Sequence, residues 1–128
     1  LSGCVSSKPI PHKETMVDET LPIVKLTKMG TIVDMKTIAL EWKPIEDTRV
    51  RGIYIYKARL SSEGKGSDGY YHTVNSRYGT HFVDNDVEPE SSYSYYFITY
   101  SKNAQSLPSK ATIVTTLPIM KSVSWIHC

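Results

Sequence analysis

Apolar and polar residues alternate with a period of two along most of this chain. The apolar residues Ile38, Leu40 and Trp42 are separated by single residues, which is typical of a β-strand with one buried face. The same pattern predicts strands at Pro22–Leu26, Ile38–Trp42, Val50–Lys57, Tyr70–Val74, Thr80–Asp84, Ser92–Tyr100 and Ala111–Thr116, with Ser92–Tyr100 the longest. No segment has a convincing period of 3.6 residues, so we expect no substantial helix.

The segments between these strands carry turn residues. The run Ser61–Gly69 is rich in Gly and Ser, and a turn is expected at Asn75–Gly79. Gly52 suits a β-bulge near the start of the third strand. Seven short strands at this spacing favour an all-β fold, a seven-stranded antiparallel β-sandwich.

The stretch from Val87 to Tyr93 predicts a corner between two strands. Pro89 fixes its own backbone and cannot donate a ladder hydrogen bond, so it suits a corner and not the middle of a strand. A Tyr at such a corner can bury its ring and return its hydroxyl to nearby backbone. We expect Trp42 to fill the space between the two sheets.

Length and composition describe one domain with a hydrophobic core. The chain has 128 residues, of which 40% are hydrophobic. No run approaches the roughly 18 apolar residues that span a bilayer. The net charge of +2 comes from 15 basic and 13 acidic side chains that are well mixed, which argues against nucleic-acid binding.

The sequence offers no catalytic or metal-binding constellation. Its four histidines are scattered, and no pair has metal-ligand spacing with a third donor. Asp84 and Asp86 fit a turn better than an acid–base pair. Cys4 and Cys128 stand at opposite ends of the sequence and outside the predicted strands, so we expect no disulfide that staples the domain. We therefore expect no enzyme activity, no cofactor and no metal.

Several stretches resemble a fibronectin type III domain. They are Ile38–Pro44, Asp47 and Val50–Tyr56 for strands B and C, Thr80–Asp84, Val87, Pro89 and Tyr93 for the E–F region, and Ser106–Ser109 with Ile113–Thr116 for the approach to strand G. The resemblance covers residues 20–118 in the proper order and implies an immunoglobulin-like sandwich. Val87 stands where Leu is commoner in the family and Ile53 where Tyr is commoner.

One candidate contact surface is a stripe of tyrosines on the outer face of one sheet. If Tyr93, Tyr95 and Phe97 point inward, their neighbours in the strand point outward. The stripe then contains Tyr54, Tyr56, Tyr96, Ile98 and Tyr100, edged by Arg51, Lys57 and Arg59. Such an amphipathic aromatic composition is typical of contact surfaces. The alternative is that cross-strand aromatic pairs only stabilise an exposed sheet face.

A second candidate is the loop that follows Trp42. Its candidate ligand-binding residues are Trp42, Lys43, Pro44, Glu46, Asp47, Arg49 and Val50. The loop is charged and held at both ends by strands, as binding loops often are. The alternative is a plain connection between strands B and C with solubilising charges.

The first four residues, Leu1-Ser2-Gly3-Cys4, resemble the lipobox of bacterial lipoproteins. That resemblance implies lipidation of Cys4 and a membrane anchor there; the alternative is a chance occurrence of these four residues. Residues 5–19 are polar and contain two prolines, so residues 1–19 together are interpreted as a lipobox remnant and flexible tether. Residues 119–128 are interpreted as a linker and the start of a truncated further repeat, or as a frayed tail.

The whole arrangement resembles the fibronectin-binding lipoprotein adhesins of bacteria, the fibronectin-like protein A family. The resemblance implies a surface-anchored adhesin module in the bacterial outer membrane, with host fibronectin or another matrix protein as its ligand and type III repeats as neighbours in cis. In that family the segment after the strand-B Trp is implicated in fibronectin contact. Ile45-Glu46 departs here from more basic versions of that segment, which leaves open that another repeat binds. The competing hypothesis is a structural spacer or accessory repeat that projects another domain.

Overall fold

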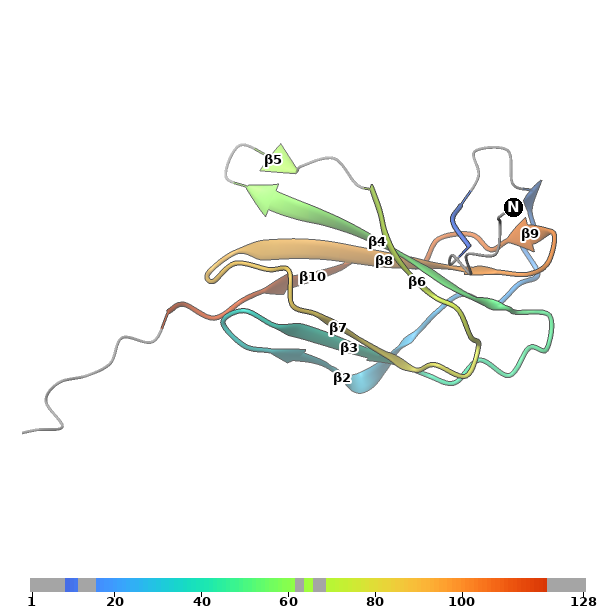
Figure 1. Cartoon of the computed structure of the whole chain (residues 1–128), viewed down its shortest axis with the longest axis horizontal. Coiled ribbons are helices and arrows are strands. Elements are labelled where there is room, and N and C mark those ends of the chain that lie inside the picture. The colour runs from blue at the N-terminus through green and yellow to red at the C-terminus, as the bar shows by residue number, and fades with distance from the viewer. Residues whose placement is uncertain (1–8, 12–15, 62–63, 66–68, 120–128) are drawn as a thin grey trace, which may run out of the picture.

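The computed structural model describes residues 9–11, 16–61, 64–65 and 69–119, which form two facing β-sheets (Figure 1). The smaller sheet has the order β2 (Leu26–Val33), β3 (Ile38–Trp42) and β7 (His81–Asp84). The larger sheet is built on β4 (Gly52–Ser61) and β8 (Ser92–Tyr100), flanked by β6 (Gly69–Val74) and β10 (Thr112–Thr115), with short additions at β1 (Met16–Val17), β5 (Gly64–Lys65) and β9 (Ala104–Gln105). The predicted all-β sandwich is confirmed.

All seven predicted strands have a counterpart, with two corrections to their bounds. The first strand is β2 at Leu26–Val33, and not Pro22–Leu26. Its polar residues and a register shift between Leu26 and Thr31 hide the alternation. The longest strand is β4 with 10 residues, and not β8 with 9, because β4 continues past Lys57 to pair with β5 and β8.

Helices are absent from the described ranges, and so none of those residues forms a helix long and apolar enough to cross a membrane.

The core between the sheets is aromatic, as the alternation predicts. Trp42 is 1% exposed, its ring centroid lies 5.4 Å from that of Phe97, and its Nε1–H donates to the Gly79 carbonyl over 2.9 Å. Tyr93 is buried, and its hydroxyl oxygen accepts the Glu88 backbone N–H over 2.7 Å, which confirms the predicted corner. Indole and corner tyrosine therefore hold the two sheets together from opposite layers.

A charged network also lies in this interior, which the alternation does not predict. Lys57 Nζ lies 2.9 Å from Asp84 Oδ2, and the two side chains are 11% and 0% exposed. The hydroxyls of Tyr95 and Tyr71 donate to the same carboxylate over 2.6 and 2.8 Å, and the Asp86 backbone N–H donates over 2.9 Å. Burial acts to raise the pKa of Asp84, but these hydrogen bonds outweigh it and hold the pKa below its usual value.

The irregularity in β4 is not at Gly52, which corrects the predicted bulge. Gly52 pairs in register with Tyr100, and a Cβ there would collide with the Val74 carbonyl oxygen and the Tyr100 ring. The shift lies farther along, where β6 has an extra residue opposite the Ile55–Tyr56 step. That extra residue is Tyr71, so the bulge turns its hydroxyl toward Asp84.

Part of the predicted tether packs on the domain. Met16 and Val17 form β1, which pairs in parallel with Ala104 and Gln105 of β9, whereas a flexible spacer was expected here. An open sheet edge offers unpaired backbone groups, and these residues use it. The domain boundary at residue 20 stays a prediction, and both Cys4 and residues 120–128 lie outside the described residues.

Candidate functional site

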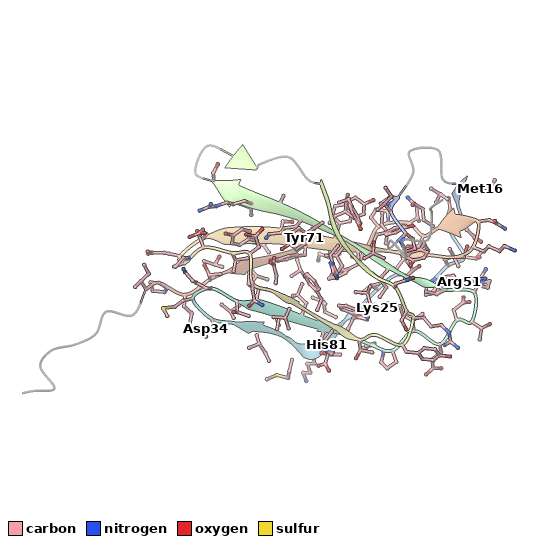
Figure 2. The ribbon with its side chains drawn as sticks, viewed as in Figure 1. Met16, Lys25, Asp34, Arg51, Tyr71 and His81 are labelled. Atoms are coloured by element: carbon pink, nitrogen blue, oxygen red, sulfur yellow. The ribbon has the colours of Figure 1, made fainter. Side chains whose placement is uncertain are left out.

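Three loops gather at one end of the sandwich, on the right in Figure 1: residues 43–51, residues 75–80 and the turn at residues 101–103. We call this the loop end. Arg77 Nη1 donates to the Ile45 carbonyl over 3.2 Å, which links the first two loops. A hollow lined by Thr48, Arg49, Arg51, Ser101, Lys102 and Asn103 joins the first to the third. In Figure 2, Arg51 lies at this end and Asp34 at the opposite end.

The loop after Trp42 has an apolar inner side and a polar outer side. Trp42, Ile45 and Val50 are buried and hold the loop on the core. The Lys43 backbone N–H donates to the Lys25 carbonyl over 2.8 Å, and the Arg51 backbone N–H donates to the Tyr100 carbonyl over 2.7 Å. The predicted residues that reach solvent are Lys43, Pro44, Glu46 and Arg49, with Asp47 half-buried. Trp42 and Val50 serve as internal supports for these outer groups.

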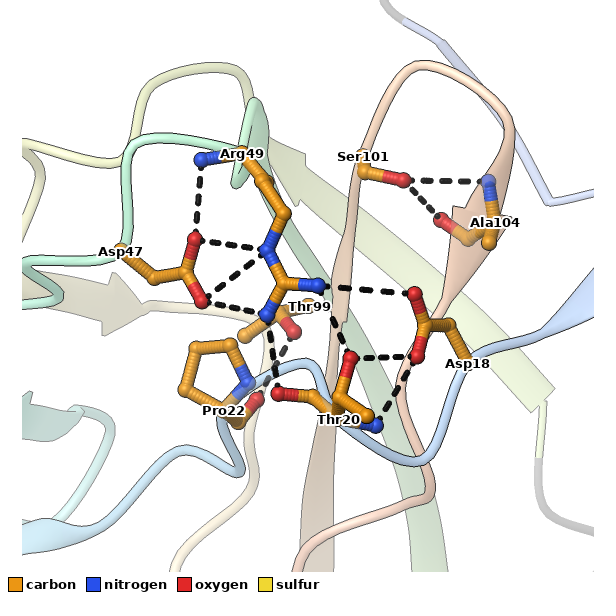
Figure 3. A network of polar contacts seen from close by, with 8 residues as sticks. All are labelled: Asp18, Thr20, Pro22, Asp47, Arg49, Thr99, Ser101 and Ala104. Carbon is orange, nitrogen blue, oxygen red and sulfur yellow. Dashed lines mark hydrogen bonds and ion pairs between the residues drawn. The ribbon is translucent and has the colours of Figure 1, made fainter.

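Arg49 fixes the shape of this loop (Figure 3). Its Nε and Nη2 donate to the two carboxylate oxygens of Asp47 over 3.0 and 2.7 Å. Its Nη1 donates to Thr20 Oγ1 over 2.8 Å, and its Nη2 also donates to the Thr20 carbonyl over 3.0 Å. The Asp18 carboxylate oxygen Oδ2 lies 3.6 Å from Arg49 Nη1 and completes the cluster. A guanidinium fork bound on two sides leaves the loop little freedom.

The same contacts shift the acidity of the groups involved. Hydrogen bonds from the Arg49 side chain and backbone lower the pKa of Asp47 to about 2. Hydrogen bonds from Thr20 lower the pKa of Asp18, and the bond to Asp47 raises the pKa of Arg49. Both carboxylates are therefore charged at neutral pH, so the loop end presents fixed ionic groups.

A neighbouring pair, Arg77 and Tyr78, is not among the candidate binding residues predicted from the sequence. Tyr78 is 76% exposed, and the Arg77 guanidinium carbon lies 4.4 Å from its ring centroid. Arg77 Nη2 also donates to the Tyr78 hydroxyl over 2.9 Å. An exposed Tyr braced by an Arg has the composition of an interface anchor. The signal available in the sequence was an aromatic residue inside a turn.

The tyrosine stripe lies where it was predicted, on the outer face of the larger sheet. The rings of Tyr54 and Tyr100 stack with centroids 4.3 Å apart, and those of Tyr56 and Tyr96 stack at 4.7 Å. Burial raises the pKa of both Tyr54 and Tyr56 to about 12, so their hydroxyls stay neutral. Tyr100 adjoins the loop end through Arg51.

The predicted charged border of the stripe is wrong for two of its three residues. Lys57 and Arg59 alternate with Tyr54 and Tyr56, so they point to the opposite face of β4. Lys57 pairs with Asp84, and the Arg59 guanidinium lies 5.9 Å from the ring centroid of the core residue Tyr93. Only Arg51 borders the stripe, where it lines a hollow together with Tyr54 and Tyr100.

Metal binding and acid–base catalysis would each need particular side chains among the described residues. No group of three or more His, Cys, Asp or Glu side chains within those residues could hold a metal ion. The buried carboxylate of the core, Asp84, is 1% exposed, and its four hydrogen bonds come from the protein itself. A closed and satisfied network of this kind stabilises an interior and offers no group to a substrate.

Comparison with known proteins identifies the fold. No protein-family model matches this sequence, and no curated protein matches it. Among solved structures, the third fibronectin III domain of human KIAA0343 protein is similar with a TM-score of 0.61 and 17% identity, covering 94% of this chain and 99% of that one. The fibronectin type III domain from human KIAA0970 protein gives 0.57 and 22%, covering 80% and 77%.

A bacterial structure is also similar. The Fn3-like protein from Clostridium thermocellum gives a TM-score of 0.57 at 18% identity, covering 80% of this chain and 98% of that one. Identities this low show the fold and leave the function to be argued from the surface. The fold occurs as a module within larger proteins, since the KIAA0343 structure is the third fibronectin III domain of its protein. The chain has the fold of a fibronectin type III domain.

Proposed function

We propose that this domain is a non-catalytic recognition module that binds a protein ligand through its loop end. The observation that carries the proposal is the rigid loop of residues 43–49, supported by buried Trp42 and Val50 and clamped by Arg49. Because the loop is already ordered, binding costs little conformational entropy. Tyr78 adds an exposed aromatic beside it.

The ligand that we propose is a host extracellular-matrix protein, with fibronectin as the leading candidate. Support comes from the resemblance of residues 42–50 to the fibronectin-contacting segment of bacterial lipoprotein adhesins. The same resemblance supports a lipid anchor at Cys4, neighbouring repeats in cis and a place on the surface of the bacterial outer membrane. Tethering at a surface raises the effective concentration of a module for an immobile ligand.

A spacer role is the second candidate, and the positions of β1 and of the segment that follows β10 favour it. In Figure 1, β1 lies at the loop end, while the chain leaves β10 toward the opposite end of the sandwich. A module whose two connections lie at opposite ends of its long axis extends a serial array. In this role the loop end would face the preceding part of the chain and bind no ligand.

The direct test is binding of the whole chain to immobilised fibronectin by surface plasmon resonance. We expect saturable binding that Lys43→Glu and Tyr78→Ser each weaken about tenfold or more, as loss of an interface anchor does. The matched control is Lys36→Glu, an exposed lysine in the turn between β2 and β3, at the end away from the loops. Equal binding by all four proteins would remove the loop end as the site, and no saturable binding by any would favour the spacer.

A further inference from the structure

Three residues on the outer face of the larger sheet are buried although they point away from the smaller sheet. Thr73 is 1% exposed, Tyr100 5% and Tyr54 7%. Tyr54 pairs with Thr73 across β4 and β6 and with Ile98 across β4 and β8. Tyr100 lies two residues beyond Ile98 in β8, so Tyr54, Thr73 and Tyr100 share the outer face. Stacking between the rings of Tyr54 and Tyr100 covers only one side of each ring, so other residues must contribute to their burial.

A short proline-containing segment covers this face. Residues 9–11 run above β4 and β8 in Figure 1, on the side turned away from the smaller sheet. Pro9 and Ile10 line a hollow together with Tyr54 and Tyr100. The Thr73 hydroxyl donates to the Pro9 carbonyl over 2.7 Å, across 64 positions of sequence. The burial of Thr73 therefore comes from the segment that it binds.

The chemistry of the hollow suits proline. Proline has no backbone N–H, so an extended segment of prolines offers carbonyl acceptors and flat apolar rings. Stacked and edge-on tyrosines provide the matching surface, with Tyr70 edge-on to Tyr54 at 6.1 Å.

The hydroxyl groups of Tyr100, Tyr70 and Thr73 on this face have partners within the protein. The Tyr100 hydroxyl donates to Asn75 Oδ1 over 2.9 Å, and the Tyr70 hydroxyl bonds to Thr73 Oγ1 over 2.6 Å. With Tyr70 as the donor of that pair, the Thr73 proton is free for a carbonyl of the segment. The segment is therefore held on this face by apolar contact and by one hydrogen bond to its Pro9 carbonyl.

We propose that the surface formed by Tyr54, Tyr100 and Thr73 is a docking groove for a proline-containing extended peptide segment, which this chain fills with its own residues 9–11. A partner protein with such a segment would bind by displacing them. The groove borders the loop end, since Arg51, Asn75, Ser101 and Lys102 line its hollow. Lys43, Pro44 and Tyr78, the outer groups proposed for ligand binding, do not line it. Its occupant in cis also competes with any partner at an effective concentration on the order of millimolar, typical of a short linker.

The test uses the full chain and a variant in which Pro9→Gly, Ile10→Ser and Pro11→Gly remove the segment's shape and apolar contact. The probe is a synthetic peptide of residues 6–14, titrated into each protein and followed by amide chemical shifts in NMR. We expect saturable shifts at Tyr54, Thr73, Asn75 and Tyr100 in the variant, and apparent binding about tenfold weaker in the natural chain because of the cis competitor. A peptide with Pro9→Ala and Pro11→Ala is the matched probe and should bind several-fold more weakly.

Two results would overturn the proposal. The first is a variant chain with native-like spectra whose groove amides do not respond to the peptide. The second is equal affinity of the two peptides, which would mean that proline is not what the groove recognises. A Tyr78→Ser chain, altered only at the loop end, should bind the peptide as the natural chain does, so failure here and failure of fibronectin binding are separable outcomes.

Discussion

Replacing Lys57 by Met tests the charged network in the core. The substitution keeps the length and apolar stem of the side chain and removes only the ammonium group, which lies 2.9 Å from Asp84 Oδ2. The carboxylate would then remain buried with three donors, from Tyr95, Tyr71 and the Asp86 backbone. The contact of the Lys57 ammonium with the Tyr71 ring, 4.4 Å from its centroid, would be lost as well.

The size of the loss in unfolding free energy depends on the Asp84 carboxylate, which stays buried without its cation. Breaking a buried ion pair by removing one partner costs about 3–5 kcal/mol, because the other charge is left uncompensated. Three remaining hydrogen bonds keep the cost near the lower end, so we expect the free energy of unfolding to fall by about 3 kcal/mol. Adding Asp84→Asn removes the stranded charge, so the double variant should lose less than the two single losses combined, with a coupling of about 1–3 kcal/mol.

The pH dependence has a definite sign. The folded-state pKa of Asp84 is depressed below the usual value of 3.8, so the carboxylate contributes stability above that pH and loses it as the pH falls through the folded pKa. The difference in unfolding free energy between the natural chain and Lys57→Met should therefore be largest at pH 7. It should shrink as the pH falls below about 4.

Urea unfolding followed by far-ultraviolet circular dichroism at pH 7 and at pH 3 provides the measurement. With a slope of about 1–3 kcal/mol per molar urea, a loss of about 3 kcal/mol moves the midpoint by 1 M or more. Lys36→Met, an exposed lysine in the turn between β2 and β3, is the control. If Lys57→Met and Lys36→Met unfold at the same midpoint, the ion pair is not buried as described.

Three further substitutions test other parts of the structure. Tyr93→Phe should lower the unfolding free energy by about 1–2 kcal/mol in urea titrations, since the Glu88 N–H loses its acceptor; an unchanged midpoint would refute the corner. Trp42→Ala should cost about 3–5 kcal/mol in the same assay because it opens a cavity against Phe97, whereas a loss below 1 kcal/mol would place the indole in solvent. Arg49→Met should return the pKa of Asp47 from about 2 toward 3.8 in a carboxyl NMR titration, and a pKa that stays near 2 would show that the clamp is not what lowers it.

The fold could be predicted because its determinants are local. Alternation placed Trp42 and Tyr95 in the core, and the Pro89–Tyr93 spacing predicted the corner and its hydroxyl bond. The first signal is a period of two and the second is proline chemistry. Both can be recognised in the sequence without knowing which residues pack against one another. Strand bounds were less secure, since β2 has a polar sequence and an interrupted register.

The charged network could not be predicted because it joins the two sheets. Alternation with Tyr54 and Tyr56 turns Lys57 to the inner face, but its partner Asp84 lies on β7 of the other sheet, and no pattern in the sequence reports that contact. The bulge that turns Tyr71 toward Asp84 lies in β6 and has no mark in the sequence, whereas Gly52, where a bulge was predicted, lies in β4 and pairs in register with Tyr100. Lys57 therefore lies on the core face of β4, while its sequence neighbour Tyr56 lies on the outer face.

The surface sites depend on contacts between distant segments. The Arg49 clamp joins Asp47 to Thr20, and the groove joins Pro9 to Thr73. Composition and resemblance were enough to point to the loop and to the tyrosine stripe. Which residues of the loop face solvent, and what covers the stripe, required the packing of the whole domain.

Hydrogen–deuterium exchange of the whole chain, with and without fibronectin, tests most directly whether the loop end is the recognition surface. We expect fibronectin to slow exchange at residues 43–49 and 76–79, with the turn at residues 34–37 unchanged at the far end of the sandwich. Slowed exchange confined to the outer strands of either sheet, or none at saturating fibronectin, would contradict the proposed function.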